Sequence, residues 1–173
     1  MSHRAALVAG SLALALTGLA PAGAGQGRAA PEAWRSFEGT WSATGRRQVV
    51  AIEGEAVAAI VEISGAVVVT GGDWLSRGFR GQAIGFDDGQ GLAVGRSVWT
   101  DENGDRLFSR LKGEPPQTGK GLIGTITGGT GRYAGLEGEF SLTWQYVVAA
   151  EDGVIQGRAV GLKGRVRRVG APR

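Results

Sequence analysis

The chain has 173 residues and a formal net charge of +3, from 19 Lys and Arg against 16 Asp and Glu. It contains no Cys, and its single His and single Met are His3 and Met1. The remainder therefore lacks imidazole, thiolate and thioether groups. This excludes a Ser-His-Asp triad, a thiol nucleophile, disulfides, structural zinc and haem or iron–sulfur ligation. We accordingly expect no cofactor and no metal site.

The N-terminus has the pattern of a signal peptide. Arg4 precedes an apolar and small-residue run, Ala5 to Leu16, and small residues at 20–24 offer a cleavage site. A span of the membrane needs about 20 apolar residues, so a retained anchor is the weaker alternative. We expect a secreted or periplasmic protein without a stable membrane anchor. The predicted segments are a signal peptide at 1–24, a flexible lead-in at 25–36, one folded domain at 37–168 and a tail at 169–173.

The first distinctive segment of the folded domain, Ala56 to Val69, is apolar on both faces of a strand. Glu62 is one of the few residues that interrupt it. One face can line a core, and the other needs a cover. The chain's own N-terminal strand and a second subunit are both candidates, so a homo-oligomer is one possible partner state.

Turn-forming residues separate the next three predicted strands. Asp87 to Gly91 divides a strand at 77–86 from one at 92–100, and Asp101 to Gly104 precedes a strand at 105–112. Asn103-Gly104 favours a type I′ turn.

Asp101, Asn103 and Asp105 resemble the first ligands of a calcium loop. However, Arg106 stands where the loop needs Gly, and Lys112 where it needs Glu. A hairpin turn is therefore the favoured interpretation.

Two Gly-rich strings follow. Gly119 to Gly124 matches G-x-G-x-x-G, but Thr125 to Thr127 continues as a strand where a dinucleotide site needs a helix. We therefore set aside a dinucleotide fingerprint. The second string, at 128–138, is considered below.

The last two predicted strands show period-2 alternation, joined by a turn at 151–153. Their apolar faces carry Phe140, Leu142, Trp144, Tyr146 and Val148, and then Val154, Val160, Leu162 and Val166. The opposite face of the final strand carries Lys163, Arg165 and Arg167. No aromatic residue interleaves with this basic cluster, so we interpret it as a solvated edge and expect no nucleic-acid partner.

About eight or nine short strands joined by tight turns predict an all-β fold. A closed antiparallel up-and-down β-barrel of about eight strands, calycin-like, is favoured over a sandwich because closure removes exposed edges. Gly is abundant, with 32 residues, as coiled and bulged strands require.

Three charged residues share strand faces with apolar ones: Glu62, Arg96 and Arg158. If those faces point inward, the charges form a polar patch in an apolar cavity beside Trp144 and Tyr146, which suits a small hydrophobic or amphipathic ligand. The alternative is a structural ion pair, or strand ends at which the side chains reach water.

The string Gly128-Gly129-Thr130-Gly131-Arg132-Tyr133-Ala134-Gly135, continued by Leu136-Glu137-Gly138, resembles a segment shared by allene oxide cyclase-like and dirigent-like proteins. Residues 37–167 are compatible with their barrel, and the pattern is similar to that of bacterial secreted homologues. The resemblance implies an eight-stranded barrel with an apolar interior, often trimeric or dimeric, that binds a small hydrophobic molecule. It transfers no catalytic residue. The Gly-rich segment is structural in our interpretation, with Tyr133 able to plug a barrel end.

These observations favour an exported β-barrel that binds a small hydrophobic or amphipathic molecule, and they lean against an enzyme. One alternative is a cofactor-free cyclase or isomerase, assisted by Glu62 or Arg96. Another is an envelope structural or interaction protein whose barrel is filled by its own side chains.

Overall fold

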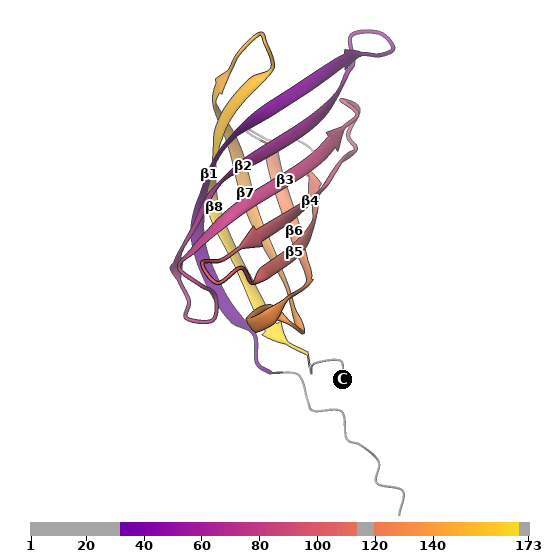
Figure 1. The fold of residues 1–173 in the computed structure, drawn as a ribbon. Helices are drawn as coiled ribbons and strands as arrows, with labels where there is room; N and C mark the ends of the chain where they lie inside the picture. Colours follow the sequence, from indigo (N-terminus) through magenta and orange to yellow (C-terminus); the bar gives the residue numbers. More distant parts are fainter. Residues whose placement is uncertain (1–31, 114–119, 170–173) are drawn as a thin grey trace, which may run out of the picture.

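The computed structural model describes residues 32–113 and 120–169, and it shows a closed barrel of eight strands. Each strand pairs antiparallel with the next one in sequence, and the last pairs with the first (Figure 1), so the up-and-down β-barrel is confirmed. The strands are β1 (Arg35–Ala51), β2 (Val57–Gly71), β3 (Gly78–Asp87), β4 (Ala93–Thr100), β5 (Arg106–Gly113), β6 (Lys120–Gly129), β7 (Leu136–Ala149) and β8 (Val154–Arg168), with a short 3-10 helix η1 (Gly131–Tyr133).

The predicted signal peptide lies outside the described residues, as do most of the lead-in and of the tail. The first strand begins at Arg35, so the barrel starts two residues earlier than expected. No helix within 32–113 and 120–169 is long and apolar enough to cross a membrane.

Aromatic side chains fill the middle of the barrel. Trp41 from β1, Trp99 from β4 and Phe140 from β7 are buried. The Trp99 ring centroid lies 6.3 Å from that of Trp41 and 5.1 Å from that of Phe140. These side chains meet because alternation along each strand sends every second residue inward, and closure brings the inner faces together.

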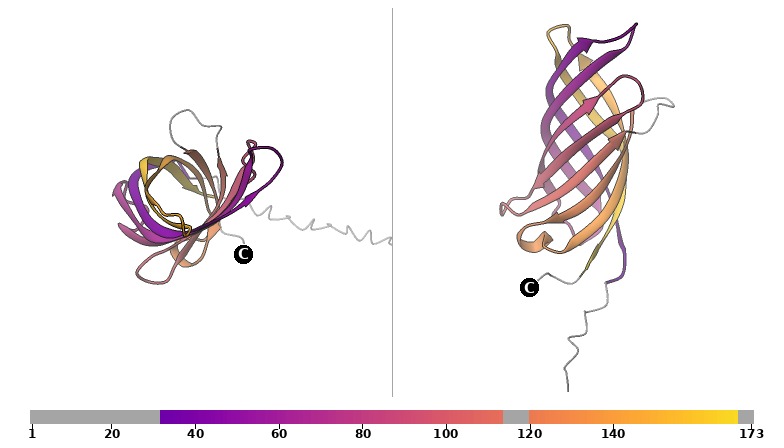
Figure 2. Two further views of the ribbon diagram at one scale, coloured as in Figure 1. Left: turned by 90° about the horizontal axis from the view of Figure 1, so that it is seen from above. Right: turned by 90° about the vertical axis from the view of Figure 1, so that its right-hand side faces the viewer.

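The two ends of the barrel differ. At one end η1 folds under the strands and carries the fully buried Tyr133, whose ring lies 5.7 Å from that of Phe79. At the other end the β1–β2 and β7–β8 hairpins extend beyond the shorter strands (Figure 1), and the view along the barrel shows the ring of strands (Figure 2). We call these the plugged end and the open end.

A bulge interrupts the alternation of β8. The pairing with both β1 and β7 shifts where β8 reaches Gly161, which has a left-handed φ of +65°. Leu162 and Val166 are buried, but Val160 is exposed. The prediction that these residues share one face was therefore wrong, because the extra residue reverses the inward and outward positions.

The outer face of β2 is apolar and exposed in the folded barrel. Ile60 and Val68 are exposed, whereas Ile63 and Val67 point into the core. The first strand, β1, pairs with the edge of β2 and so does not cover this face. Cover by the N-terminal strand is thus contradicted, and a second subunit stays a prediction.

The hairpin after β4 is confirmed, with a different turn from the one expected. The Gly104 N–H donates to the Asp101 carbonyl (3.1 Å), and Gly104 has a φ of +83°. This bond places Asn103 third in the turn, followed by a left-handed Gly, instead of centring a type I′ turn on Asn103-Gly104. The Asp101 carboxylate closes the turn by accepting from the Asn103 and Asp105 N–H groups, at 2.9 and 3.0 Å.

Candidate ligand-binding cavity

An apolar cavity of about 110 Å³ lies in the open half of the barrel. Its lining is almost entirely apolar and comes from strands β2 to β7. The residues lining it are Val61, Ile63, Ala83, Ile84, Gly85, Phe86, Asp87, Ala93, Val94, Gly95, Leu111, Gly113, Leu122, Trp144 and Tyr146.

Small residues create this space. Along β3 and β4 the inward positions are taken by Ala83, Gly85, Ala93 and Gly95, where the plugged half carries Phe79 and Trp99. The wall opposite these small residues is bulkier, with Trp144 as its largest member. The cavity is thus encoded by side-chain size at alternate strand positions and needs no distortion of the strands.

The volume sets the class of molecule that fits. Drug-sized ligands occupy pockets of roughly 300–1,000 Å³, whereas an apolar cavity of about 150 Å³ holds benzene. At about 110 Å³, this cavity matches a single ring or a short alkyl segment.

Two predicted site residues line the cavity. Trp144 is buried, and Tyr146, two positions further along β7, is 38% exposed at the open end. Trp144 therefore supplies an apolar wall. The phenol of Tyr146 supplies a polar group close to solvent.

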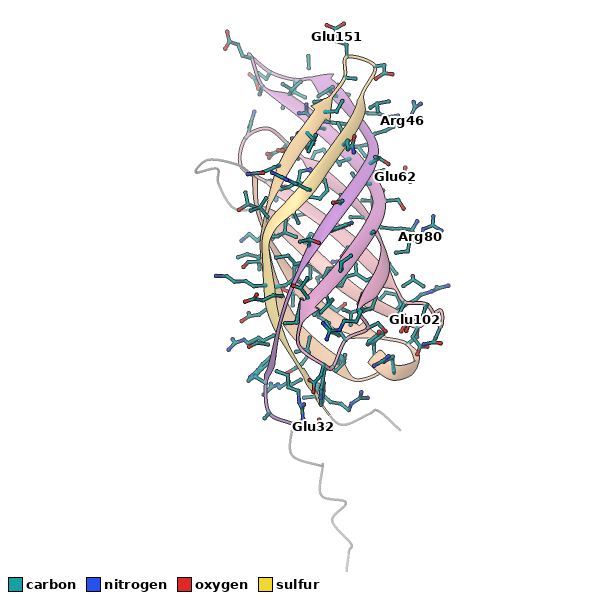
Figure 3. All side chains as sticks on the ribbon, turned by 90° about the vertical axis from the view of Figure 1, so that its left-hand side faces the viewer. Glu32, Arg46, Glu62, Arg80, Glu102 and Glu151 are labelled. Atoms are coloured by element: carbon teal, nitrogen blue, oxygen red, sulfur yellow. The ribbon has the colours of Figure 1, made fainter. Side chains whose placement is uncertain are left out.

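Glu62, Arg96 and Arg158 lie on the outer face of the barrel, so the premise that they point inward is wrong. Val61 and Ile63 line the cavity on either side of Glu62, and the strand period of two turns Glu62 outward, where Figure 3 shows it projecting from the barrel. Arg96 precedes the buried Ser97, and Arg158 lies between the buried Gly157 and Ala159. All three side chains therefore lie on the opposite face of their strands from the one that a binding role inside the barrel requires.

A different charge occupies the inner face. Arg47 is half-buried between the exposed Arg46 and Gln48, and it pairs with Val61 of the cavity wall. It therefore lies on the inner side of β1 at the open end. Counting by twos from Trp41 would have indicated this position.

The plugged end holds a network of buried polar groups. The Tyr133 hydroxyl donates to Oδ2 of Asp101 (2.8 Å), and the Ser76 hydroxyl donates to the same oxygen (3.3 Å). The Ser76 Oγ also accepts from the Arg132 guanidinium (3.2 Å). Sequence reasoning identified Tyr133 as a plug but missed Ser76, which is 57 positions away and carries no pattern.

The two acidic groups of this network titrate away from their ordinary ranges. Burial alone would raise the pKa of Asp101, but hydrogen bonds from Tyr133, the backbone and Ser76 outweigh it and hold that pKa below its usual value. Burial raises the pKa of Tyr133 to about 12, and the adjoining Asp101 carboxylate adds to the shift. Each group is therefore held in the form that suits the Tyr133–Asp101 hydrogen bond.

The Gly-rich motif builds the plug. Thr130 exchanges two hydrogen bonds with the Arg106 backbone, and the Arg132 N–H donates to Asp105 Oδ2 (3.0 Å). Gly131 has a φ of +51°, and a Cβ there would lie 1.8 Å from Asp105 Oδ1. These contacts are those of a structural element, since the motif lies at the opposite end of the barrel from the cavity.

The basic cluster on β8 is also engaged within the chain. Arg165 pairs with Glu139 (2.6 Å), and Arg167 pairs with Glu137. Both guanidinium groups lie over the Trp34 ring, at 4.7 and 4.4 Å from its centroid. The fold thus brings to this cluster an aromatic group that the local sequence lacks.

A comparison of the sequence with protein-family models and with curated proteins finds no match. The fold and the site therefore define the class: an eight-stranded antiparallel β-barrel, plugged at one end, with a small apolar cavity in its open half.

Proposed function

We propose that the protein binds a small apolar or amphipathic molecule in the open half of its barrel. The observation that carries this proposal is the cavity lined by Trp144, Leu111 and Leu122, with small residues on the facing strands. A barrel serving only as a scaffold would be stabilised by larger side chains at Ala83 and Gly85, because an unfilled apolar volume costs free energy.

The ligand class follows from volume and charge. A single ring or a short alkyl segment fits the cavity, and a polar end would lie toward the open end, where Tyr146 and Asp87 line the cavity and Arg47 pairs with Val61 of its wall. Arg47 favours a carboxylate or another anionic group there, since guanidinium and carboxylate form charge-assisted hydrogen bonds. The preferred ligand is therefore a small aromatic or aliphatic acid.

Two sequence features support a role outside the cytoplasm and kinship with allene oxide cyclase-like proteins. These are the signal-peptide pattern at 1–24 and the Gly-rich motif at 128–138. An isomerase of this kind would have to use groups at the open end, because Glu62 and Arg96 face outward. Protein recovered outside the cytoplasm, with a new N-terminus close to Ala24, would support export.

The binding proposal is tested by filling the cavity. Ala83→Leu adds three carbon atoms to the cavity wall, and Ala66→Leu adds the same atoms to the exposed outer face of β2. We expect amide NMR titration with toluene and with benzoate to shift signals of cavity residues. The Ala83→Leu variant should lose at least about tenfold in affinity, the equivalent of roughly 1.4 kcal/mol. Equal binding by both variants, or no shift in the unaltered protein, would refute the proposal.

A further inference from the structure

The outer face of β2, β3 and β4 carries an apolar patch. Ile60, Ile84, Phe86 and Val94 are 51%, 57%, 43% and 44% exposed. The strand register places them together, with Ile60 and Val94 on either side of Phe86. Isolated exposed apolar side chains are ordinary, but bulky ones gathered across three strands mark an interaction surface. We call these four residues the β2–β4 patch.

Opposite charges flank this patch. Glu62 and Arg96 pair with Ile84 from its two sides, and both are exposed. Within residues 32–113 and 120–169, neither side chain makes a hydrogen bond or an ion pair, unlike the Arg–Glu pairs of β7 and β8. Arg96 also lies directly across from Arg110, a like-charge neighbour that disfavours the bare surface. A carboxylate from outside the chain would relieve this repulsion.

We propose that two copies of this chain associate through the β2–β4 patch, about a two-fold axis that runs along β3. Half a turn about this axis exchanges the positions of β2 and β4. Ile84 and Phe86 then meet their own counterparts, and Ile60 faces Val94 of the second copy. Glu62 faces Arg96 of the second copy, twice over by symmetry. Apolar residues thus meet apolar ones and acid meets base, as an isologous interface requires.

Other arrangements of the same face fit less well. A two-fold axis across the strands would set Glu62 against Glu62 and Arg96 against Arg96, which repel. With the axis along β3, Arg46 and Arg110 would also come opposite each other. However, eight strands complete the circle, so the outer surface turns by about an eighth of a turn per strand, and β1 and β5 face sideways from the contact. This curvature opens a gap at the flanks of the contact, where the long side chains of Arg46 and Arg110 can point into water.

The same curvature limits the strength of the dimer. A stable interface buries about 800 Å² per partner, and contact over three strands of a convex barrel is smaller. The dimer should therefore be reversible, dependent on concentration and weakened by salt. This inference is argued from side chains exposed on the outer face and not from ligand binding, although Ile84, Phe86 and Val94 also border the cavity.

Sedimentation velocity of the full folded chain at about 5 to 500 µM tests the proposal, since this range spans weak association. Glu62→Arg and Arg96→Glu each place like charges at both symmetric contacts, and each should weaken self-association by about 100-fold. The double variant restores opposite charges and should recover the dimer. A mixture of the two single variants should form a heterodimer more strongly than either variant alone.

Lys163→Glu on the outer face of β8 is the matched control, because it changes the net charge as Arg96→Glu does, and it should leave association unchanged. Circular dichroism verifies folding of these surface variants. A monomer throughout the range, a trimer, or no recovery in the double variant and the mixture would each overturn the proposed dimer. A monomer would leave a different protein as the partner of the patch.

Discussion

At the scale of single residues, the plugged end depends on one hydrogen bond between buried groups. The Tyr133 hydroxyl donates to Asp101, whose other carboxylate oxygen holds the β4–β5 turn. A single carboxylate thereby joins the plug to a hairpin. If either partner is lost, the other stays buried with neither a protein partner nor water to bond to. The free-energy cost of such an unsatisfied buried group exceeds the net contribution of an ordinary hydrogen bond.

Tyr133→Phe should therefore destabilise the protein by about 1–3 kcal/mol, because it removes a hydrogen-bond donor to a buried carboxylate. Urea denaturation monitored by tryptophan fluorescence measures the change. Tyr146→Phe is the control: it removes a hydroxyl from a partly exposed ring and should change stability by less than about 0.5 kcal/mol. Equal losses in both variants would contradict this role of the hydroxyl.

The free energy of unfolding should fall at acidic pH and at alkaline pH, and a different group should cause each loss. The pKa of Asp101 is lowered on folding, so its contribution is present above the unfolded value of about 3.9 and is lost as pH falls through the folded value. The pKa of Tyr133 is raised to about 12, so its contribution is complete below about 10 and is lost as pH rises toward 12.

Denaturation midpoints measured against pH would show these two limbs. Asp101→Asn should flatten the acid limb, and Tyr133→Phe the alkaline limb. An alkaline limb that survives in Tyr133→Phe would have to come from other groups, and it would refute the assignment to Tyr133.

At the scale of elements, the bulge in β8 decides which residues reach the core. Gly161 takes a left-handed conformation, and the positions beyond it change face. Residues 155 to 159 alternate in one phase, and residues 162 to 166 in the other. Gly161 thus allows the apolar residues of both segments of β8 to point inward, although the two segments alternate in opposite phases.

Gly161→Ala should cost about 1–2 kcal/mol, because the left-handed conformation disfavours any Cβ although the space around it is open. Gly161→Asn should cost less, since Asn tolerates this conformation better. Gly78→Ala is a matched control, with equally open space and no left-handed φ, and it should be near neutral. Thermal unfolding of the three variants compares the costs; similar values for Gly161→Ala and Gly78→Ala would contradict the strain argument.

The predicted elements followed from local chemistry, and most of them are present. Turn residues at 87–91 and 101–104 divide β3, β4 and β5 close to the expected bounds. It is harder to predict from the sequence which face of each strand points into the barrel. Where both faces of a strand carry apolar residues, as in β2, the sequence pattern does not tell the inner face from the outer. An inward Glu62 was therefore left open as one alternative, and Arg47 was not singled out.

At the scale of the whole molecule, closure separates an inner surface from an outer one and gives each a different partner. The inner surface combines an aromatic half with a half of small residues, which leaves the cavity. The outer surface carries the β2–β4 patch between Glu62 and Arg96. The two proposed contacts share part of one wall, because Ile84, Phe86 and Val94 of the patch also border the cavity.

Charge at the open end should discriminate between ligands. Arg47→Gln should weaken binding of benzoate by about tenfold and leave toluene binding unchanged, because only benzoate presents a carboxylate to the guanidinium. Arg46→Gln, one position away on the outer face, is the matched control and should alter neither. Isothermal titration calorimetry separates the two ligands; parallel losses for both in the Arg47 variant would indicate a structural role for Arg47 instead.

The sequence by itself determined that this protein is a chain of antiparallel strands without histidine or cysteine chemistry beyond its first residues, because alternation and turn residues act over a few neighbours. Two residues that the sequence singled out, Trp144 and Tyr146, line the cavity. Only the tertiary structure decided which face of each strand is inside. That choice depends on the register around a closed ring and on the bulge at Gly161, where distant strands must agree at once.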